Sequence, residues 1–172
     1  MIFYLWNPAW LTTKLRANMG ELVTFTGFAG GLQSVLTPEF TNGSQAFYIF
    51  DFYVTHASIM TIAMYIILVH GQQLKKGAAW RSFNRIQFLA LAAFLANLAT
   101  GGNYMYLMEP PIADNPLIIT QARYPGLFES LPFLYKIEGV LHVLFFEVFA
   151  LLNFLLLEVL FRRVRAKRLV VN

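Results

Sequence analysis

The chain has 172 residues, of which 58% are hydrophobic and only 13% are charged, and it contains 17 Phe and no Cys. Soluble domains carry about 25% charged residues, so this composition excludes an ordinary soluble globule and favours a membrane protein with several spans. The lack of Cys excludes disulfides, thiolate metal ligands and a cysteine nucleophile. The formal net charge is +4, but the basic residues gather at the borders of apolar segments, so nucleic acid is not an expected partner.

The first segment, 1–11, is apolar but is interrupted at Asn7-Pro8. At about 1.5 Å per residue it is too short to cross a bilayer, and it lacks the features of a secretory signal peptide. We expect an interfacial helix or the remnant of a lost span.

Four longer apolar segments follow, at 22–36, 47–69, 86–100 and 132–161, and each predicts a transmembrane helix. The first contains Gly27, Gly30 and Gly31, which favour close packing against a neighbouring helix. The connection at 101–131 is rich in Tyr and Pro and predicts a structured outer loop. The sequence therefore predicts an all-α, polytopic membrane helical bundle that forms a single domain over 1–172.

The basic residues predict how this bundle is oriented. Eleven of the 13 Lys and Arg alternate onto one side, and only Arg123 and Lys136 fall on the other. The positive-inside rule therefore places both termini in the cytoplasm.

Several polar residues occur inside the predicted spans, where ionisable groups are costly and need a reason. His56 and His142 are expected at similar depth, and Glu138 and His142 form an i, i+4 pair on one helix stripe. The remaining polar residues near the outer ends of the spans include Gln33, Asn97 and Asn103. One interpretation is a network of interhelical hydrogen bonds worth on the order of 1 kcal/mol each. The other is a catalytic or transport site in which Glu147 is the charge partner of His56.

A third interpretation concerns haem. His56 and His70 are fourteen residues apart, which places them near one helix face at two levels, a spacing used by b-type membrane cytochromes. His142 could supply the second axial ligand at the outer level, whereas the sequence offers no second axial ligand at the level of His70. The sequence shows none of the motifs typical of soluble-type active sites, and we expect no cofactor or metal site.

Four parts of the sequence carry a family resemblance: Gly27-Phe-Ala-Gly-Gly-Leu-Gln-Ser-Val-Leu-Thr-Pro-Glu39, Phe52-Tyr-Val-Thr-His56, Thr100-Gly-Gly-Asn-Tyr-Met-Tyr-Leu107, and Glu147 before Ala150. They resemble the YwaF-type bacterial integral membrane proteins, a family similar to animal transmembrane proteins proposed to act as lipid acyltransferases or hydrolases. The similarity extends from about Gly20 to Phe161. It implies a bacterial inner (cytoplasmic) membrane protein with His56, Asn103, Tyr104 and Glu147 in a shared polar centre.

The resemblance also brings out a difference. Members of that family carry further N-terminal spans with a Leu-His-Leu-Cys-Asp-like motif, whose Cys is the suspected nucleophile of the animal relatives. This chain has no Cys, and we expect it to lack those spans. We therefore expect an interaction or scaffold subunit of a membrane complex, with membrane lipids and other transmembrane subunits as partners. The alternative is a lipid acyltransferase or hydrolase-like enzyme with His56 as base, and a b-type haem protein is a minor alternative.

Overall fold

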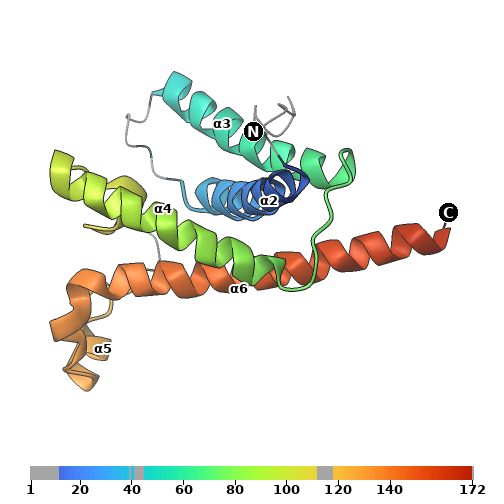
Figure 1. Ribbon diagram of the computed structural model, residues 1–172. Helices are drawn as coiled ribbons and strands as arrows, with labels where there is room; N and C mark the ends of the chain where they lie inside the picture. Colours follow the sequence, from blue (N-terminus) through green and yellow to red (C-terminus); the bar gives the residue numbers. More distant parts are fainter. Residues whose placement is uncertain (1–11, 39, 41–44, 112–117, 172) are drawn as a thin grey trace. The chain divides into compact units, whose positions relative to one another are not determined.

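The computed structural model describes residues 12–38, 40, 45–111 and 118–171 (Figure 1). The helices in chain order are α2 (Thr13–Leu36), α3 (Ala46–Leu68), α4 (Ala78–Thr100), the short 3-10 helix η1 (Tyr104–Tyr106), α5 (Pro125–Ser130) and α6 (Leu134–Val171). The predicted all-α class is confirmed, because the described part of the chain contains helices and their connections but no strand. The expected interfacial segment at 1–11 lies outside the described residues.

Two of the four predicted spans are helices that are long and apolar enough to cross a membrane. These are α3, over Ala46–Leu68, and the part of α6 over Leu134–Arg163. Few residues of either span are buried in the structure, 11% of the most apolar window in α3 and 17% in α6, unlike the core helix of a soluble domain, whose apolar side is buried.

The other helix boundaries differ from the prediction. The predicted spans at 22–36 and 86–100 are the later parts of α2 and α4, which begin earlier, at Thr13 and Ala78. The first two turns of α4 contain polar residues that the hydropathy pattern assigned to a connection. At the other end of the chain, α6 extends past 161 to Val171. Helix formation continues in all three cases because Lys, Arg and Glu are good helix formers.

The structure divides into two compact units. Unit 1 comprises residues 1–85 and 151–172, and unit 2 comprises residues 86–150. The helices α4 and α6 each contribute residues to both units, so each unit is described by itself.

In unit 1, α2 and α3 pack closely through glycines. A Cβ atom on Gly31 would lie 2.6 Å from Met60 Cγ and 2.9 Å from the His56 carbonyl oxygen, and one on Gly27 would lie 3.4 Å from Ala63 Cβ. Because the later glycine contacts the earlier part of α3, the two helices run antiparallel. Only a residue without a Cβ allows backbones to approach this closely.

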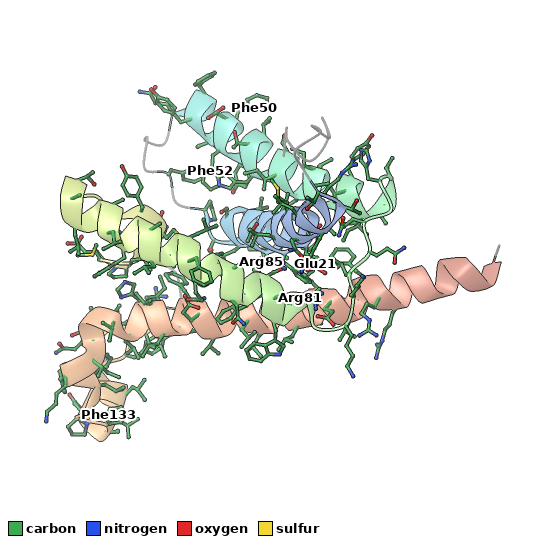
Figure 2. The ribbon with its side chains drawn as sticks, viewed as in Figure 1. Glu21, Phe50, Phe52, Arg81, Arg85 and Phe133 are labelled. Carbon is green, nitrogen blue, oxygen red and sulfur yellow. The ribbon has the colours of Figure 1, made fainter. Side chains whose placement is uncertain are left out.

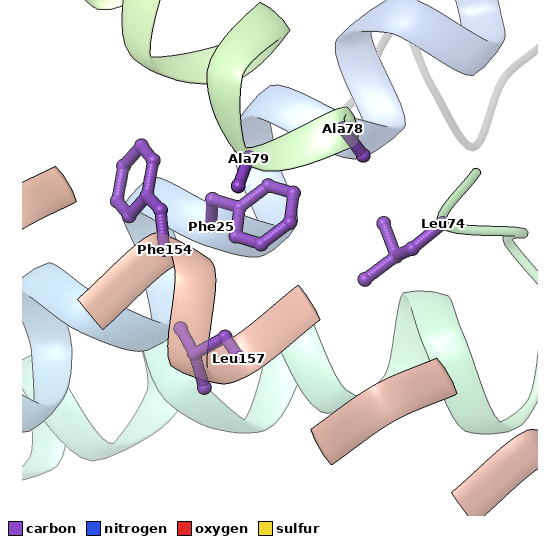
Figure 3. Packing of buried hydrophobic residues seen from close by; sticks show 6 residues of the cluster. All are labelled: Phe25, Leu74, Ala78, Ala79, Phe154 and Leu157. Atoms are coloured by element: carbon purple, nitrogen blue, oxygen red, sulfur yellow. The ribbon is translucent and has the colours of Figure 1, made fainter. Parts of the chain in front are cut away.

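The core of unit 1 joins segments that are far apart in the sequence (Figure 3). Phe25 of α2 packs against Phe154 of α6, with 5.2 Å between ring centroids. Around this pair lie Leu74, Ala78, Ala79 and Leu157. The second half of α6 is therefore held to α2 and to the start of α4 by apolar burial.

In unit 2, the connection between α4 and α6 is folded rather than extended. Ile118, Phe128 and Leu134 are buried, and the Phe128 ring meets the Tyr135 ring edge-to-face at 5.3 Å. These contacts hold α5 against the beginning of α6.

Candidate functional site

Three polar residues of unit 2 that we predicted as site residues lie around the loop at 101–109, which follows α4. They are Asn97, Asn103 and His142. Asn97 is only 2% exposed. Its Oδ1 accepts a hydrogen bond from the Tyr104 backbone N–H at 2.7 Å, and its Nδ2 donates to the Tyr104 carbonyl oxygen at 3.1 Å. One buried amide thus satisfies both backbone groups of Tyr104, which fixes the start of the loop against α4.

Asn103 organises the rest of this loop. Its Oδ1 accepts from the backbone N–H groups of Met108 at 3.1 Å and Glu109 at 3.2 Å, while its Nδ2 donates to the Glu109 carbonyl oxygen at 3.0 Å. Such bonds from Asn to the nearby backbone are the usual way in which this residue shapes a turn.

His142 of α6 reaches the same loop from a distant part of the chain. Its ring is 2% exposed, and Nε2 lies 2.9 Å from the Tyr106 carbonyl oxygen. A carbonyl oxygen can only accept, so Nε2 carries the proton. This bond holds a strained backbone, because Met105 and Tyr106 have φ values of 59° and 51°, a left-handed conformation that is unfavourable for residues other than Gly.

Glu147 lies further along α6 and accepts a hydrogen bond of 2.7 Å from Gln87 Nε2 of α4. Since Gln87 precedes Asn97 in α4 and Glu147 follows His142 in α6, the two helices run antiparallel in unit 2. The structure thus gives Glu147 an uncharged partner that the sequence did not suggest.

His56, the predicted base, belongs to α3 in unit 1. Its Nδ1 lies 2.7 Å from the Phe52 carbonyl oxygen, and its ring lies against the Phe52 ring with 4.1 Å between centroids. Because Nδ1 donates to that carbonyl, the neutral ring carries its lone pair on Nε2. In this tautomer, Nε2 is the ring atom that could act as a proton acceptor.

The Ser58 hydroxyl, two residues after His56, is engaged elsewhere. Ser58 Oγ donates to the Val54 carbonyl oxygen at 2.6 Å, which is the usual bond of a hydroxyl in an apolar helix. In unit 1, Gln33 Nε2 donates to Thr37 Oγ1 at 2.6 Å. Gln33 and His56 belong to unit 1 and the other site residues to unit 2, so a single centre that contains all of them stays a prediction, as does the pairing of His56 with Glu147.

Metal and haem binding receive no added support from the geometry. Within the part of the chain that the structure describes, no group of three His, Cys, Asp or Glu side chains could hold a metal ion. His56 and His142, the two ligands expected at one haem level, belong to different units. The haem interpretation stays a prediction.

Unit 1 contains a charged cluster that the sequence did not reveal (Figure 2). Glu21 of α2 is 4% exposed. Its carboxylate accepts from Arg81 Nη2 at 2.6 Å and Nε at 3.2 Å, and from Arg85 Nη1 at 3.2 Å. The hydrogen bond to Glu21 raises the pKa of Arg81 above its usual value, against a smaller lowering by desolvation. The signal available in the sequence was weak: one Glu at the border of a span and two Arg on the same predicted side.

A second buried carboxylate of unit 1 closes the start of α4. Glu158 of α6 accepts from the backbone N–H groups of Gly77 and Ala79, both at 2.8 Å, and its Oε1 lies 3.5 Å from Arg162 Nη1. Ala79 lies in the first turn of α4 and Gly77 directly before it, and N–H groups at the start of a helix have no partner within the helix. Glu158 therefore caps α4 and ties α6 to it.

Comparison with known proteins adds one result. The sequence profile of the TMEM164 family matches residues 1–158. The comparisons with curated proteins and with solved structures find no match.

Proposed function

The chain belongs to the TMEM164 family. We propose that it is a four-span protein of the bacterial cytoplasmic membrane that acts as a scaffold for other membrane subunits. Membrane residence follows from the family and from two helices of sufficient length and apolarity. The YwaF-type relationship, the bacterial cytoplasmic membrane, the four spans and the scaffold role belong to the proposal.

The direction of the helices supports four spans. The helices α2 and α3 run antiparallel within unit 1, and α4 and α6 run antiparallel within unit 2. In unit 1, the start of α4 also contacts the first half of α2, through Arg81 and Glu21. Alternating directions, with the basic residues at one set of ends, are what four successive crossings require.

A regular apolar ridge on α6 is the observation that carries the scaffold proposal. Every fourth residue from 140 to 160 is an exposed Val or Leu: Val140, Leu144 and Val148 in unit 2, and Leu152, Leu156 and Leu160 in unit 1. A row of side chains four residues apart is the ridge that fits the groove of a second helix. The row contains no aromatic residue, although the chain has 17 Phe.

The polar centre supports the same proposal because its hydrogen bonds are used internally. Asn97, Asn103 and His142 bond the backbone of one loop, and Glu147 bonds Gln87. These side chains shape the fold, and fixed polar networks of this kind hold helices in register.

The test is photo-crosslinking in intact membranes, with a crosslinking residue at Leu152 on the ridge. The matched control is Leu95, an equally exposed leucine of α4. We expect a discrete protein adduct from position 152 and mainly lipid adducts from position 95. Lipid adducts alone at both positions would remove the scaffold proposal.

His56 supports a second candidate, a lipid acyltransferase or hydrolase. The ring has its proton on Nδ1 and its lone pair on Nε2, as a general base needs. We expect wild-type protein to show no turnover of phospholipid or fatty ester. Turnover that His56→Gln abolishes, by a factor of roughly 10² to 10⁴ and without loss of folding, would favour the enzyme.

A further inference from the structure

We propose that one end of unit 1, here called the basic end, is a contact surface for anionic phospholipid headgroups. The basic end consists of the first turns of α2 and α4, the connection at 69–77 and the last turns of α6. The proposal goes beyond the scaffold role, because it requires only that the protein resides in a membrane.

Hydrogen bonds between these four segments define the basic end. Gln72 Nε2 donates to the Ala17 carbonyl oxygen at 3.2 Å, which joins the connection after α3 to α2. Arg85 Nη1 donates to the Asn18 carbonyl oxygen at 3.4 Å, which joins α4 to α2. The cap that Glu158 forms joins α6 to α4.

Formal charge is divided very unevenly between the two units. Unit 1 contains 11 of the 13 Lys and Arg and four of the nine Asp and Glu, which gives a formal charge of +7. Unit 2 has a formal charge of −3, and the two values add up to the +4 of the chain. An excess of this size attracts anions over about 8 Å at physiological ionic strength.

Two acidic side chains of unit 1, Glu21 and Glu158, are already bonded inside it. Glu21 is buried between Arg81 and Arg85, and Glu158 is buried against the backbone of α4. Neither carboxylate reaches the surface to neutralise the remaining cations.

Four cations of the basic end are exposed and unpaired among the described residues: Lys14, Lys75, Lys76 and Arg163. No hydrogen bond or ion pair engages their side chains within that part of the chain. Clusters of four to eight Lys and Arg beside a membrane-spanning helix bind anionic lipids, with about 1 kcal/mol for each residue near the surface.

An exposed tryptophan gives an independent indication of where this surface lies. Trp80 follows Ala79 in the first turn of α4 and is 50% exposed. Its indole lies edge-to-face against Phe83, at 6.2 Å between centroids. Exposed Trp side chains are enriched at the level of the lipid headgroups. We therefore expect Lys75 and Lys76, which precede Trp80 by five and four residues, to lie near the phosphates.

The experiment compares lipid preference in the full chain. The protein is reconstituted in bilayers of equal parts phosphatidylcholine and phosphatidylglycerol, and the lipids retained after mild extraction are counted by native mass spectrometry. Wild type should retain phosphatidylglycerol preferentially. The double variant Lys75→Gln/Lys76→Gln should lower this preference roughly 30-fold, because two residues at about 1 kcal/mol each are removed. Higher salt should weaken the wild-type preference, because exposed charges are screened.

The matched control is Arg123→Gln/Lys136→Gln, which removes the same charge from unit 2. It should leave the preference unchanged, and melting profiles should show that both double variants are folded. Equal retention of the two lipids by wild type, or an equal loss in both variants, would overturn the proposal. The proposal would also fail if inorganic phosphate, added to protein in pure phosphatidylcholine, raised the melting temperature as much as phosphatidylglycerol does. Crosslinking at Leu152 should be the same in every variant, so failure here is distinct from failure of the scaffold proposal.

Discussion

Adjacent glycines in α2 offer a sharp test of how α2 and α3 pack, because they differ only in the face they occupy. A Cβ on Gly31 would lie 2.6 Å from Met60 Cγ and 2.9 Å from the His56 carbonyl oxygen, whereas one on Gly30 would have nothing within 4 Å. Met60 can turn its flexible side chain away. The His56 carbonyl is backbone and can retreat only if α3 moves.

The expected free energies follow from this difference. Gly31→Ala gains up to about 1 kcal/mol in helix propensity and loses about 1–3 kcal/mol to overpacking, so the variant should be less stable by about 1–2 kcal/mol. Gly30→Ala has the same propensity gain and no clash, so it should be more stable by about 0.5–1 kcal/mol. Gly27→Ala, with its nearest atoms at an ordinary 3.4 Å, should fall between them.

The measurement is reversible unfolding of the full chain in mixed micelles, followed by helical circular dichroism with increasing denaturing detergent. The order of stability should be Gly30→Ala, then Gly27→Ala, then Gly31→Ala. If Gly31→Ala proved as stable as Gly30→Ala, the close approach of α2 and α3 would be refuted. Equal destabilisation by all three would point to a general effect of alanine in α2 instead.

Three further changes test other contacts. Thr24→Val should stabilise the protein by about 1 kcal/mol, because the Thr24 hydroxyl is buried with no partner among the described residues; an unchanged or lower melting temperature would contradict this. Asn97→Leu should speed amide hydrogen exchange at Tyr104, which loses its acceptor, by at least about tenfold; unchanged protection would show that the loop does not depend on Asn97. Glu158→Ala should cost about 1–2 kcal/mol through loss of the cap on α4, with Glu158→Gln between it and wild type in the same melting assay.

The sequence predicted helices better than it predicted their ends. The helix α3 agrees with the predicted span to within one residue at each end, because its apolar run is continuous. The start of α4 was misplaced because Arg81 and Arg85 are polar and interrupt the hydropathy pattern. Their charges are compensated by Glu21, 60 and 64 residues away, and hydropathy contains no information on such distant partners.

The contrast between local patterns and distant partners also explains which contacts of the candidate site could be predicted. Asn97 and Tyr104 are only seven residues apart, and their position at the end of one predicted span already indicated a common location. The contact of His142 with the Tyr106 carbonyl spans 36 residues, and it depends on the conformation of a loop that has no periodic pattern. The partner of Glu147 could not be predicted, because many polar residues of the neighbouring helices were equally plausible.

Unit 1 is built from both ends of the chain, and this has a consequence for its synthesis. Residues 86–150 must be made before the second half of α6 exists, which takes roughly 3–13 s at translation rates of about 5–20 residues per second. During this interval Phe25 has no Phe154 to pack against, and the N–H groups of Gly77 and Ala79 have no cap. The ion pairs of Glu21 with Arg81 and Arg85 can already form, because all three residues are synthesised before residue 86. The nascent chain therefore relies first on charge and on the glycine contacts of α2 and α3, and its apolar core closes only when the last helix arrives.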